Sequence, residues 1–462
     1  MLRSRFCYLI FLWVSAVVVF SGCASYHTKN IKLYRAIETG QFEAANHLLE
    51  KDSKSPNNRN RLLFFLNRGY VSWMLNDYRQ SVDFLNTAEN IIDDYSMNLG
   101  AEALALVSNP MVKPYRAEDF EVVMVNCFKA INFMQLNEYE SAMVECRRIN
   151  LKLNRLNDKY PSHKNRYRDD AFAHTMMGLL YDANGDYNNA FIAYRNALNI
   201  YENDYAQNFG VQTPQQLKKD ILRTAYQTGF GDELNFYERK FGMKYTPSQK
   251  PDAEMIFFWM NGFGPVKDEW SVNFTIIRGS GGMVTFVNEG EGVSFPFPLA
   301  SSSEKDAFSD LKLVRVAFPK YVERKPVSLN AVISSGAANY PLELAENINA
   351  IAFKTLSDRF MREMANSLLR VATKQALEEA SRKKDKNVGA MLSILNAVTE
   401  KADTRNWQCL PYGISYARIP LSNGDNRLSL NVKMANGKMV SSDVSLNAKK
   451  GKIYFHAFHT LN

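Results

Sequence analysis

The chain has 462 residues, of which 46% are hydrophobic and 23% are charged, and its formal net charge is +8. This composition is typical of folded proteins and excludes a disordered or collagen-like chain. Five cysteines in this length exclude a disulfide scaffold. The positive charge is mild and no dense run of lysine and arginine accompanies it, so we expect no nucleic-acid partner. The length predicts more than one domain.

The first 22 residues have the pattern of a lipoprotein signal peptide. Two arginines precede an apolar run over residues 6–20, which is short for a stable membrane anchor. The run ends in a Ser-Gly-Cys sequence that resembles the bacterial lipobox, and this resemblance implies cleavage before Cys23 and lipidation of Cys23. Several acyl chains would hold the protein durably. Ala24 then implies sorting to the outer membrane, and we expect the protein to face the periplasm. The alternative is an ordinary signal peptide with a chance cysteine.

A repeat pattern runs through the first half of the chain. After a tether over residues 23–30, the region 31–245 has a helical pattern with weaker repeat copies near Gly69 and Ala130. In the clearest copy, small and aromatic residues fall at the spacings of the tetratricopeptide repeat, where a small residue lets two antiparallel helices touch. These residues are Gly178, Tyr181, Ala190, Tyr194 and Ala197. We predict a tetratricopeptide-like α-solenoid over 31–245, with one concave face.

A change of composition at Thr246–Pro251 marks a domain boundary, after which strand patterns dominate. The predicted strands are Met255–Met260, Ser271–Ile277, Met283–Val287, Leu311–Phe318, Ser328–Ile333, Tyr412–Ile419, Arg427–Met434, Lys438–Leu446 and Lys452–His456. An apolar stripe at helical spacing interrupts them and predicts a helical hairpin over 343–403. We therefore predict an α+β multidomain protein. Its α-solenoid is followed by a discontinuous β-sandwich-like domain over 252–342 and 404–462, whose last three strands form a meander.

Two segments of the second half are the most specific parts of the sequence: 261–267 (NGFGPVK) and 403–407 (DTRNW). Together with residues 314–319 and 347–369, the lipobox and the repeats, they resemble an uncharacterised family of bacterial tetratricopeptide outer-membrane lipoproteins. Members of that family are often encoded beside small lipoproteins, one of them similar to curli-secretion pore proteins. The resemblance implies other envelope proteins as partners, with a pore-like lipoprotein as one candidate. It implies no biochemical activity.

The predicted concave face is apolar. In the repeat template this face is lined by the first helix of each pair, and the phase of the repeats puts five large apolar residues there. They are Tyr70, Trp73, Met134, Phe172 and Leu179. If the face is open, it is a groove for a hydrophobic peptide or helix of another envelope protein. If it is covered by the β domain or the tether, the same residues belong to a core. Both alternatives stay open.

No motif of a known catalytic site occurs: the sequence has no H-E-x-x-H, P-loop, G-x-S-x-G or C-x-x-C. His456 and His459 lie three apart on a predicted strand, so they point to opposite faces and cannot share a metal. We predict a non-catalytic scaffold or adaptor without metal or cofactor. Exposed aromatics on a sheet face would favour a cell-wall or glycan-binding lipoprotein instead. A pocket where Asp, Glu or His converge from distant segments would favour an enzyme with an unrecognised site.

A few charged and thiol side chains have alternative interpretations. Asp403 and Arg405, which precede a tryptophan, are interpreted as a buried ion pair rather than a catalytic fragment. Lys267 is interpreted as a solvent-facing cation. In an oxidising compartment Cys127 and Cys146 could form a disulfide, although two unpaired helix residues are the favoured alternative.

Overall fold

The structure is a computed structural model that describes most of the chain. The described residues are 26–97, 113–158, 167–247, 251–279, 283–288, 290, 292–298, 313–360, 364, 367–368, 371, 374 and 401–461. The predicted signal peptide and Cys23 lie outside these residues, as does nearly all of the second helix of the predicted insertion.

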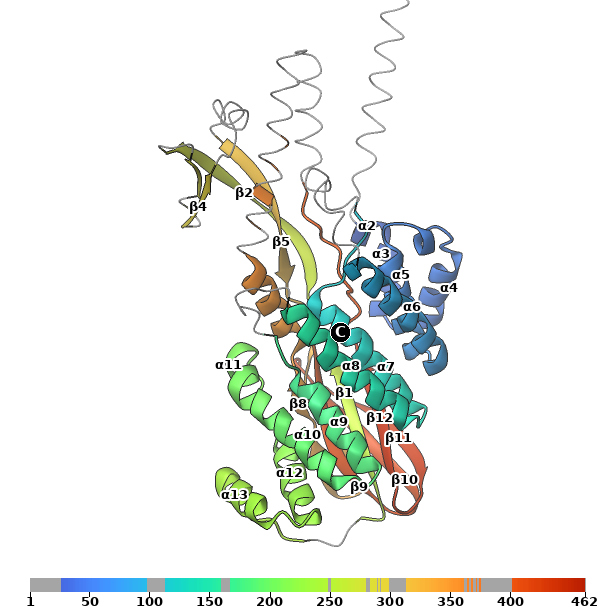
Figure 1. The fold of residues 1–462 in the computed structure, drawn as a ribbon. Helices are drawn as coiled ribbons and strands as arrows, with labels where there is room; N and C mark the ends of the chain where they lie inside the picture. Colours follow the sequence, from blue (N-terminus) through green and yellow to red (C-terminus); the bar gives the residue numbers. More distant parts are fainter. Residues whose placement is uncertain are drawn as a thin grey trace, which may run out of the picture.

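The N-terminal part of the described chain is helical (Figure 1). Its α-helices are α2 (Tyr26–Lys29), α3 (Ile31–Glu38), α4 (Phe42–Lys51), α5 (Arg61–Met74), α6 (Tyr78–Met97), α7 (Asp119–Gln135), α8 (Tyr139–Asn157), α9 (Ala171–Ala183), α10 (Tyr187–Ile200), α11 (Ala206–Asn208), α12 (Gln215–Gln227) and α13 (Gly231–Phe241). A short 3₁₀ turn, η1 (Ser55–Asn57), precedes α5, and a π-helical turn, η5 (Tyr201–Tyr205), follows α10. Consecutive helices pack in pairs, so the prediction of a helical N-terminal part is confirmed.

The helix pairs close where a small residue of the first helix meets a large residue of the second. A Cβ atom on Gly178 would lie 2.3 Å from the ring of Tyr194, and one on Gly69 would lie 2.7 Å from Leu85. Only glycine permits this close approach. In the turn between α9 and α10, Gly185 has a φ of 75°, a left-handed conformation that favours glycine. These are the contacts and the turn that the repeat pattern predicts.

Three four-stranded sheets follow among the described residues: a central sheet (β12-β1-β9-β8), an outer sheet (β11-β10-β6-β7) and a third sheet (β4-β3-β2-β5). Their strands are β1 (Ala253–Asn261), β2 (Val266–Arg278), β3 (Met283–Asn288), β4 (Val293–Pro298), β5 (Leu313–Val322), β6 (Ser328–Ser335), β7 (Ala338–Pro341), β8 (Glu343–Glu346), β9 (Gly413–Leu421), β10 (Gly424–Met434), β11 (Met439–Ala448) and β12 (Ile453–Thr460). The prediction of strands in this part of the chain is therefore confirmed.

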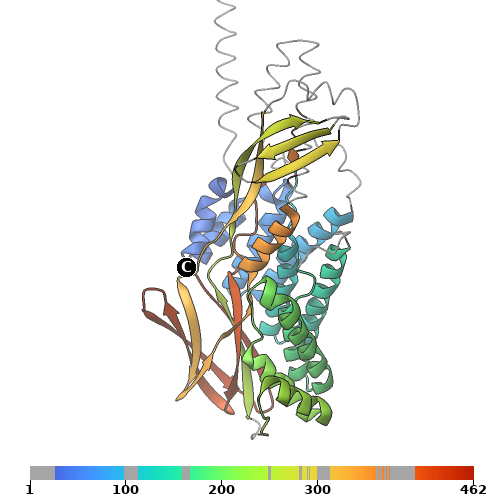
Figure 2. The same ribbon diagram turned by 90° about the vertical axis from the view of Figure 1, so that its left-hand side faces the viewer.

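The central sheet lies between the helices and the outer sheet. Side chains alternate along β1: Phe258 and Met260 share a core with the helices, whereas Phe257 and Trp259 share a core with the outer sheet. Figures 1 and 2 show the helices along one face of this sheet and the outer sheet beyond its other face. A strand that is buried on both faces reads as a nearly continuous apolar run, and β1 has that sequence.

The third sheet lies at the opposite end of the molecule from the outer sheet (Figures 1 and 2). A helix over 348–360, continued by the helical residues 364, 367, 368, 371 and 374, packs on it. The apolar stripe of this helix, which includes Phe360, Met364 and Leu368, shares a core with Phe274 and Phe318 of the sheet. The predicted first helix of the insertion is therefore present, and it packs against its own sheet.

The sheet topology corrects two predictions. The last three strands do not form a meander, because β12 leaves the β10–β11 hairpin and pairs in parallel with β1. Phe455 of β12 packs against the helices, which places this strand in the central layer. Residues 343–346, where the helical insertion was predicted to begin, form β8, which pairs with β9. β4 and β7 were not predicted.

Candidate functional site

The five residues predicted to line the concave face are buried. Tyr70 and Trp73 of α5, Met134 of α7, and Phe172 and Leu179 of α9 are at most 3% exposed. The central sheet covers them, so these described residues of the first helices are not open to a partner. The expectation of an open groove is therefore corrected in favour of the covered alternative. The face is apolar because it packs against the central sheet of the same chain.

Specific contacts join this face to the sheet. Tyr70 Oη lies 2.9 Å from Nδ1 of His459 on β12, and the rings of Phe172 and Phe258 are 5.6 Å apart. His459 Nε2 lies 2.6 Å from the carbonyl oxygen of Gly262, so the imidazole donates there and accepts from Tyr70. Burial lowers the pKa of His459 to about 4, and the bond to Gly262 opposes this only in part. A neutral histidine therefore links α5, β12 and the loop after β1.

A charged cluster fixes the far end of the same interface. Arg418 of β9 pairs with Asp182 of α9 at 2.6 Å, with Asp220 of α12 at 3.0 Å and with Glu254 of β1 at 3.0 Å. Arg223 of α12 also contacts Asp182. Burial alone would raise the pKa of Asp182, but Arg418 and Arg223 lower it to about 2. The hydroxyl of Tyr194 completes the cluster by accepting from Arg418 at 3.3 Å. Because the cluster joins α9 and α12 to β1 and β9 through groups of this chain, it is a structural lock.

The segment 261–267 ends in a second buried cluster. Lys267 Nζ and Arg359 Nη2 both contact the carboxylate of Glu118, the N-cap residue of α7. Only 7% of the Lys267 side chain is exposed, so the prediction of a solvent-facing cation is wrong. Burial would raise the pKa of Glu118, but Arg359 and Lys267 lower it to about 2. The lysine is buried at the N-terminus of α7, where Glu118 also contacts Arg359 of the helix over 348–360.

The segment 403–407 enters the same cluster from the other side. Arg405 pairs with Asp403 at 2.6 Å and donates to Asn60 at 3.0 Å. The predicted ion pair is therefore present, with a buried arginine and an aspartate that is 27% exposed. The backbone N–H of Trp407 donates to the carboxylate of Glu121 at 2.6 Å. Burial and the neighbouring Glu118 raise the pKa of Glu121 to about 7. The two most specific segments of the sequence thus meet at the N-terminus of α7 and hold the helices to the sheets.

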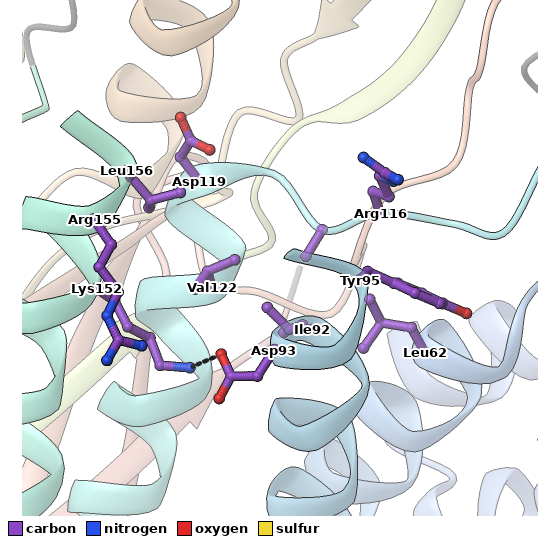
Figure 3. A pocket seen from close by; sticks show the side chains of 11 residues that line it. Leu62, Ile92, Asp93, Tyr95, Arg116, Asp119, Val122, Lys152, Arg155 and Leu156 are labelled. Atoms are coloured by element: carbon purple, nitrogen blue, oxygen red, sulfur yellow. Dashed lines mark ion pairs between the residues drawn. The ribbon is translucent and has the colours of Figure 1, made fainter. Parts of the chain in front are cut away.

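An accessible concavity of the helical part lies between α6 and α8. One pit of about 130 Å³ has walls of Leu62, Ile92, Val122 and Leu156 (Figure 3). A second hollow of about 250 Å³ continues it along α6 and α8. The second hollow is lined by Glu89, Asn90, Asp93, Arg148, Leu151, Lys152 and Arg155. Asp93, Lys152 and Arg155 border both, and we call the joint feature the α6–α8 groove.

The floor of the α6–α8 groove is a balanced ion network. Glu89 of α6 pairs with Lys129 of α7 at 2.6 Å and with Lys152 of α8 at 2.9 Å. Glu145 pairs with Lys129 at 3.0 Å and with Arg148 at 3.1 Å. Burial would raise the pKa of Glu89, but Lys152 and Lys129 lower it to about 2. The acidic groups of the floor are therefore neutralised within the chain.

The rim of the groove contains one ion pair and, beside it, an arginine that has no ion-pair partner among the described residues. Lys152 reaches across to Asp93 at 3.5 Å, as Figure 3 shows. Arg155 on the same helix makes no ion pair or hydrogen bond with any other residue that the structure describes. It is exposed at the mouth of the apolar pit, beside Lys152.

Sequence reasoning missed this groove, although α8 carries a signal. Val144, Arg148, Leu151 and Arg155 recur at steps of four, three and four, which places them on one stripe of the helix. Val144 is 45% and Leu151 57% exposed, so the stripe faces solvent. The repeat template directs attention to the first helix of each pair, whereas this stripe lies on a second helix.

Several other features bear on chemistry. Among the described residues, no group of three or more His, Cys, Asp and Glu side chains is arranged to hold a metal ion. Cys127, Cys146 and Cys409 are buried and unpaired. His456 and His459 lie on opposite faces of β12: His456 contacts Phe257 in the core of the outer sheet, and His459 faces the helices. In the part of the chain that is described, none of the helices has the length and apolar character needed to cross a bilayer.

Comparisons with known proteins leave the function open. No family model and no curated protein matches the sequence. The crystal structure of MamA covers 47% of this chain and 92% of its own, with 17% identity and a TM-score of 0.28. The crystal structure of the apo form of RapI covers 46% of this chain and 68% of its own, with 17% identity and a TM-score of 0.33. The crystal structure of BtubC from P. vanneervenii covers 54% of this chain and 90% of its own, with 15% identity and a TM-score of 0.31. Scores this low carry no argument, so the repeat architecture rests on the helix pairs of this chain itself.

Proposed function

We propose that this chain is a lipid-anchored adaptor of the bacterial cell envelope that binds other envelope proteins and catalyses no reaction. The lipobox-like sequence at Cys23 supports the anchor, and the paired helices support a binding role because such repeats typically present extended interaction surfaces. The observation that carries the adaptor role is the α6–α8 groove, a charged and partly apolar concavity that remains open on the helical part.

The buried polar clusters support a scaffold rather than an enzyme. The carboxylates of Glu118 and Asp182 are each neutralised by two basic side chains of the same chain. Carboxylates that are paired in this way fix the geometry of the protein, and these two are not free to act as a base on a substrate. The convergence of acidic residues from distant segments, which would have favoured an enzyme, therefore serves to join the helices to the sheets.

The outer sheet does not favour the glycan-binding alternative. The sequences of β10 and β11 contain no aromatic residue, and several of their solvent-facing side chains are short, polar and bonded to one another: Ser429 donates to Asp443 at 2.7 Å, and Ser441 donates to Asn431 at 2.7 Å. Glycan-binding faces use aromatic rings that pack on sugar rings, and the described residues of this part of the face are not of that kind.

The test combines fractionation with crosslinking in the bacterium that produces the protein. Cys23→Ala should move the chain out of the membrane fraction or leave it unprocessed. Chemical crosslinking of the tagged parent, followed by mass spectrometry, should recover specific envelope proteins that an untagged control lacks. A Cys23→Ala variant that migrates and fractionates like the parent would refute the anchor. Crosslinked material that matches the untagged control would refute the adaptor role.

A further inference from the structure

We propose that the α6–α8 groove binds an acidic amphipathic helix of a partner protein, which inserts one large apolar side chain into the pit. This inference rests on the proposed adaptor function and names the surface and the chemistry of the partner.

The α8 stripe has the spacing of a helix-docking surface. Val144 and Leu151 are seven residues apart, which is two helical turns or about 10.5 Å. Arg148 and Arg155 alternate with them and are also two turns apart. A partner helix lying along α8 would meet apolar and basic groups in turn. Its own complementary face would carry apolar residues at i and i+7 with Asp or Glu between them.

The pit supplies an anchor site at one end of this stripe. Its walls are the apolar side chains of Leu62, Ile92, Val122 and Leu156, and its volume is about 130 Å³. A dry apolar cavity of about 150 Å³ accommodates benzene, so the pit fits one side chain of the size of Leu or Phe. Large apolar anchors that fill such pockets supply most of the affinity of an interface.

The charge of the groove selects an acidic partner. Glu89 and Glu145 are neutralised by Lys129, Lys152 and Arg148. Arg155, which borders both hollows, has no partner among the described residues. An acidic side chain placed here gains an ion pair without breaking one, whereas a basic side chain meets an unpaired cation.

The groove favours a helix over an extended strand. Its two long walls are the parallel ridges of two helices, α6 and α8, over residues 89–93 and 148–155. A third helix packs into such a trough by ridges into grooves. Among the residues that the structure describes, no sheet edge that could pair with an extended chain borders the groove, because the lining residues lie on α5–α8 or on residues 116–117 before α7.

Site-directed photocrosslinking in the native bacterium tests the proposal on the full-length, processed protein. A benzophenone amino acid at Leu151 should give a crosslinked product whose peptide maps to an acidic amphipathic helix of another protein. The same amino acid at Ile192, an exposed apolar residue of α10, is the matched control and should not give this product. Arg155→Glu should lower the yield at Leu151 about tenfold, and Arg155→Lys should retain most of it.

A charge exchange then separates binding from folding. Replacing the acidic residue of the mapped helix that lies nearest to Arg155 by a basic residue should restore crosslinking to the Arg155→Glu variant. The melting temperature of each variant should match that of the parent. The proposal is refuted if the product at Leu151 maps to a basic or extended segment, to lipid, or to a second copy of this chain, or if it is absent. Absence at Leu151, while whole-chain crosslinking still captures envelope proteins, refutes the groove and leaves the adaptor role in place.

Discussion

The helical part has two faces: one is covered by the central sheet and the other is exposed to solvent. On the face of α5, α7 and α9, Tyr70 and Phe172 are buried against the central sheet. On the opposite side, Val144 and Leu151 of α8 are exposed and alternate with arginines. The more apolar face is an internal interface, and the mixed apolar and basic face, which is exposed, is the one that we propose binds a partner. In this chain, uninterrupted apolarity marks a surface that the chain covers itself.

The charged clusters repeat this contrast. Glu118 is enclosed by Lys267 and Arg359, and the neighbouring Glu121 accepts from the backbone N–H of Trp407, so both carboxylates are held by groups of this chain. The Glu89 network is equally well paired, but it forms the floor of a groove with Arg155 at its mouth. Paired charges therefore indicate rigidity in both clusters. The unpaired Arg155 is the feature that distinguishes the proposed binding surface from the structural lock.

The largest effect is expected where an aromatic residue is removed from the sealed face. Phe172→Ala leaves a cavity against Phe258 and should lower the free energy of unfolding by about 3–5 kcal/mol. Leu151→Ala on the open face should change it by no more than about 0.5 kcal/mol. Denaturant titrations of both variants beside the parent measure the difference. Equal stabilities of the two variants would show that the helices and the central sheet do not share a core.

A smaller loss is expected at the junction of the helices with the third sheet. Lys267→Met leaves the buried Glu118 with Arg359 as its only close cation, and breaking a buried pair in this way should cost about 3 kcal/mol. Lys320 on the neighbouring strand β5 is half exposed, so Lys320→Met serves as the control and should cost about 0.5 kcal/mol or less. Thermal melts distinguish them. A Lys267→Met variant as stable as the control would mean that the cluster is solvated.

Much of the fold could be predicted because it depends on local spacing. The contact of Gly178 with Tyr194, the turn at Gly185 and most strands follow from residues that are close in sequence. The parallel pairing of β12 with β1 could not be predicted, since it joins the two ends of the sheet region and no local pattern specifies a strand's partner. The missed strand β8 is only four residues long, and a helix pattern begins immediately after it.

The site was harder to predict than the fold. The periodicity showed correctly that Tyr70 and Phe172 lie on one apolar face, but it contains no information on what covers that face. Lys267 was misassigned because its burial depends on Glu118 and Arg359, which are distant in sequence. Arg155 was overlooked because a single exposed arginine is ordinary. It becomes informative only when the structure shows which neighbouring charges are already paired.

The smallest expected effect is a pH dependence confined to the sealed face. His459 has a pKa of about 4 in the folded protein, below the value near 6.5 of an unfolded chain. As the pH falls from 6.5 towards 4, the unfolded chain binds a proton that the folded protein does not, so stability is lost on acidification. At about 1.4 kcal/mol per pH unit, the loss at pH 5 is about 2 kcal/mol. The buried carboxylates with lowered pKa, such as Glu118 and Asp182, add to the loss at lower pH in the parent and in any His459 variant alike.

The difference between the parent and His459→Gln therefore isolates the histidine: the variant should lose less stability between pH 7 and pH 5, whatever its stability at neutral pH. Equal losses in the two proteins, measured by denaturant titration at each pH, would mean that water or a charge reaches His459 and that the face is not sealed.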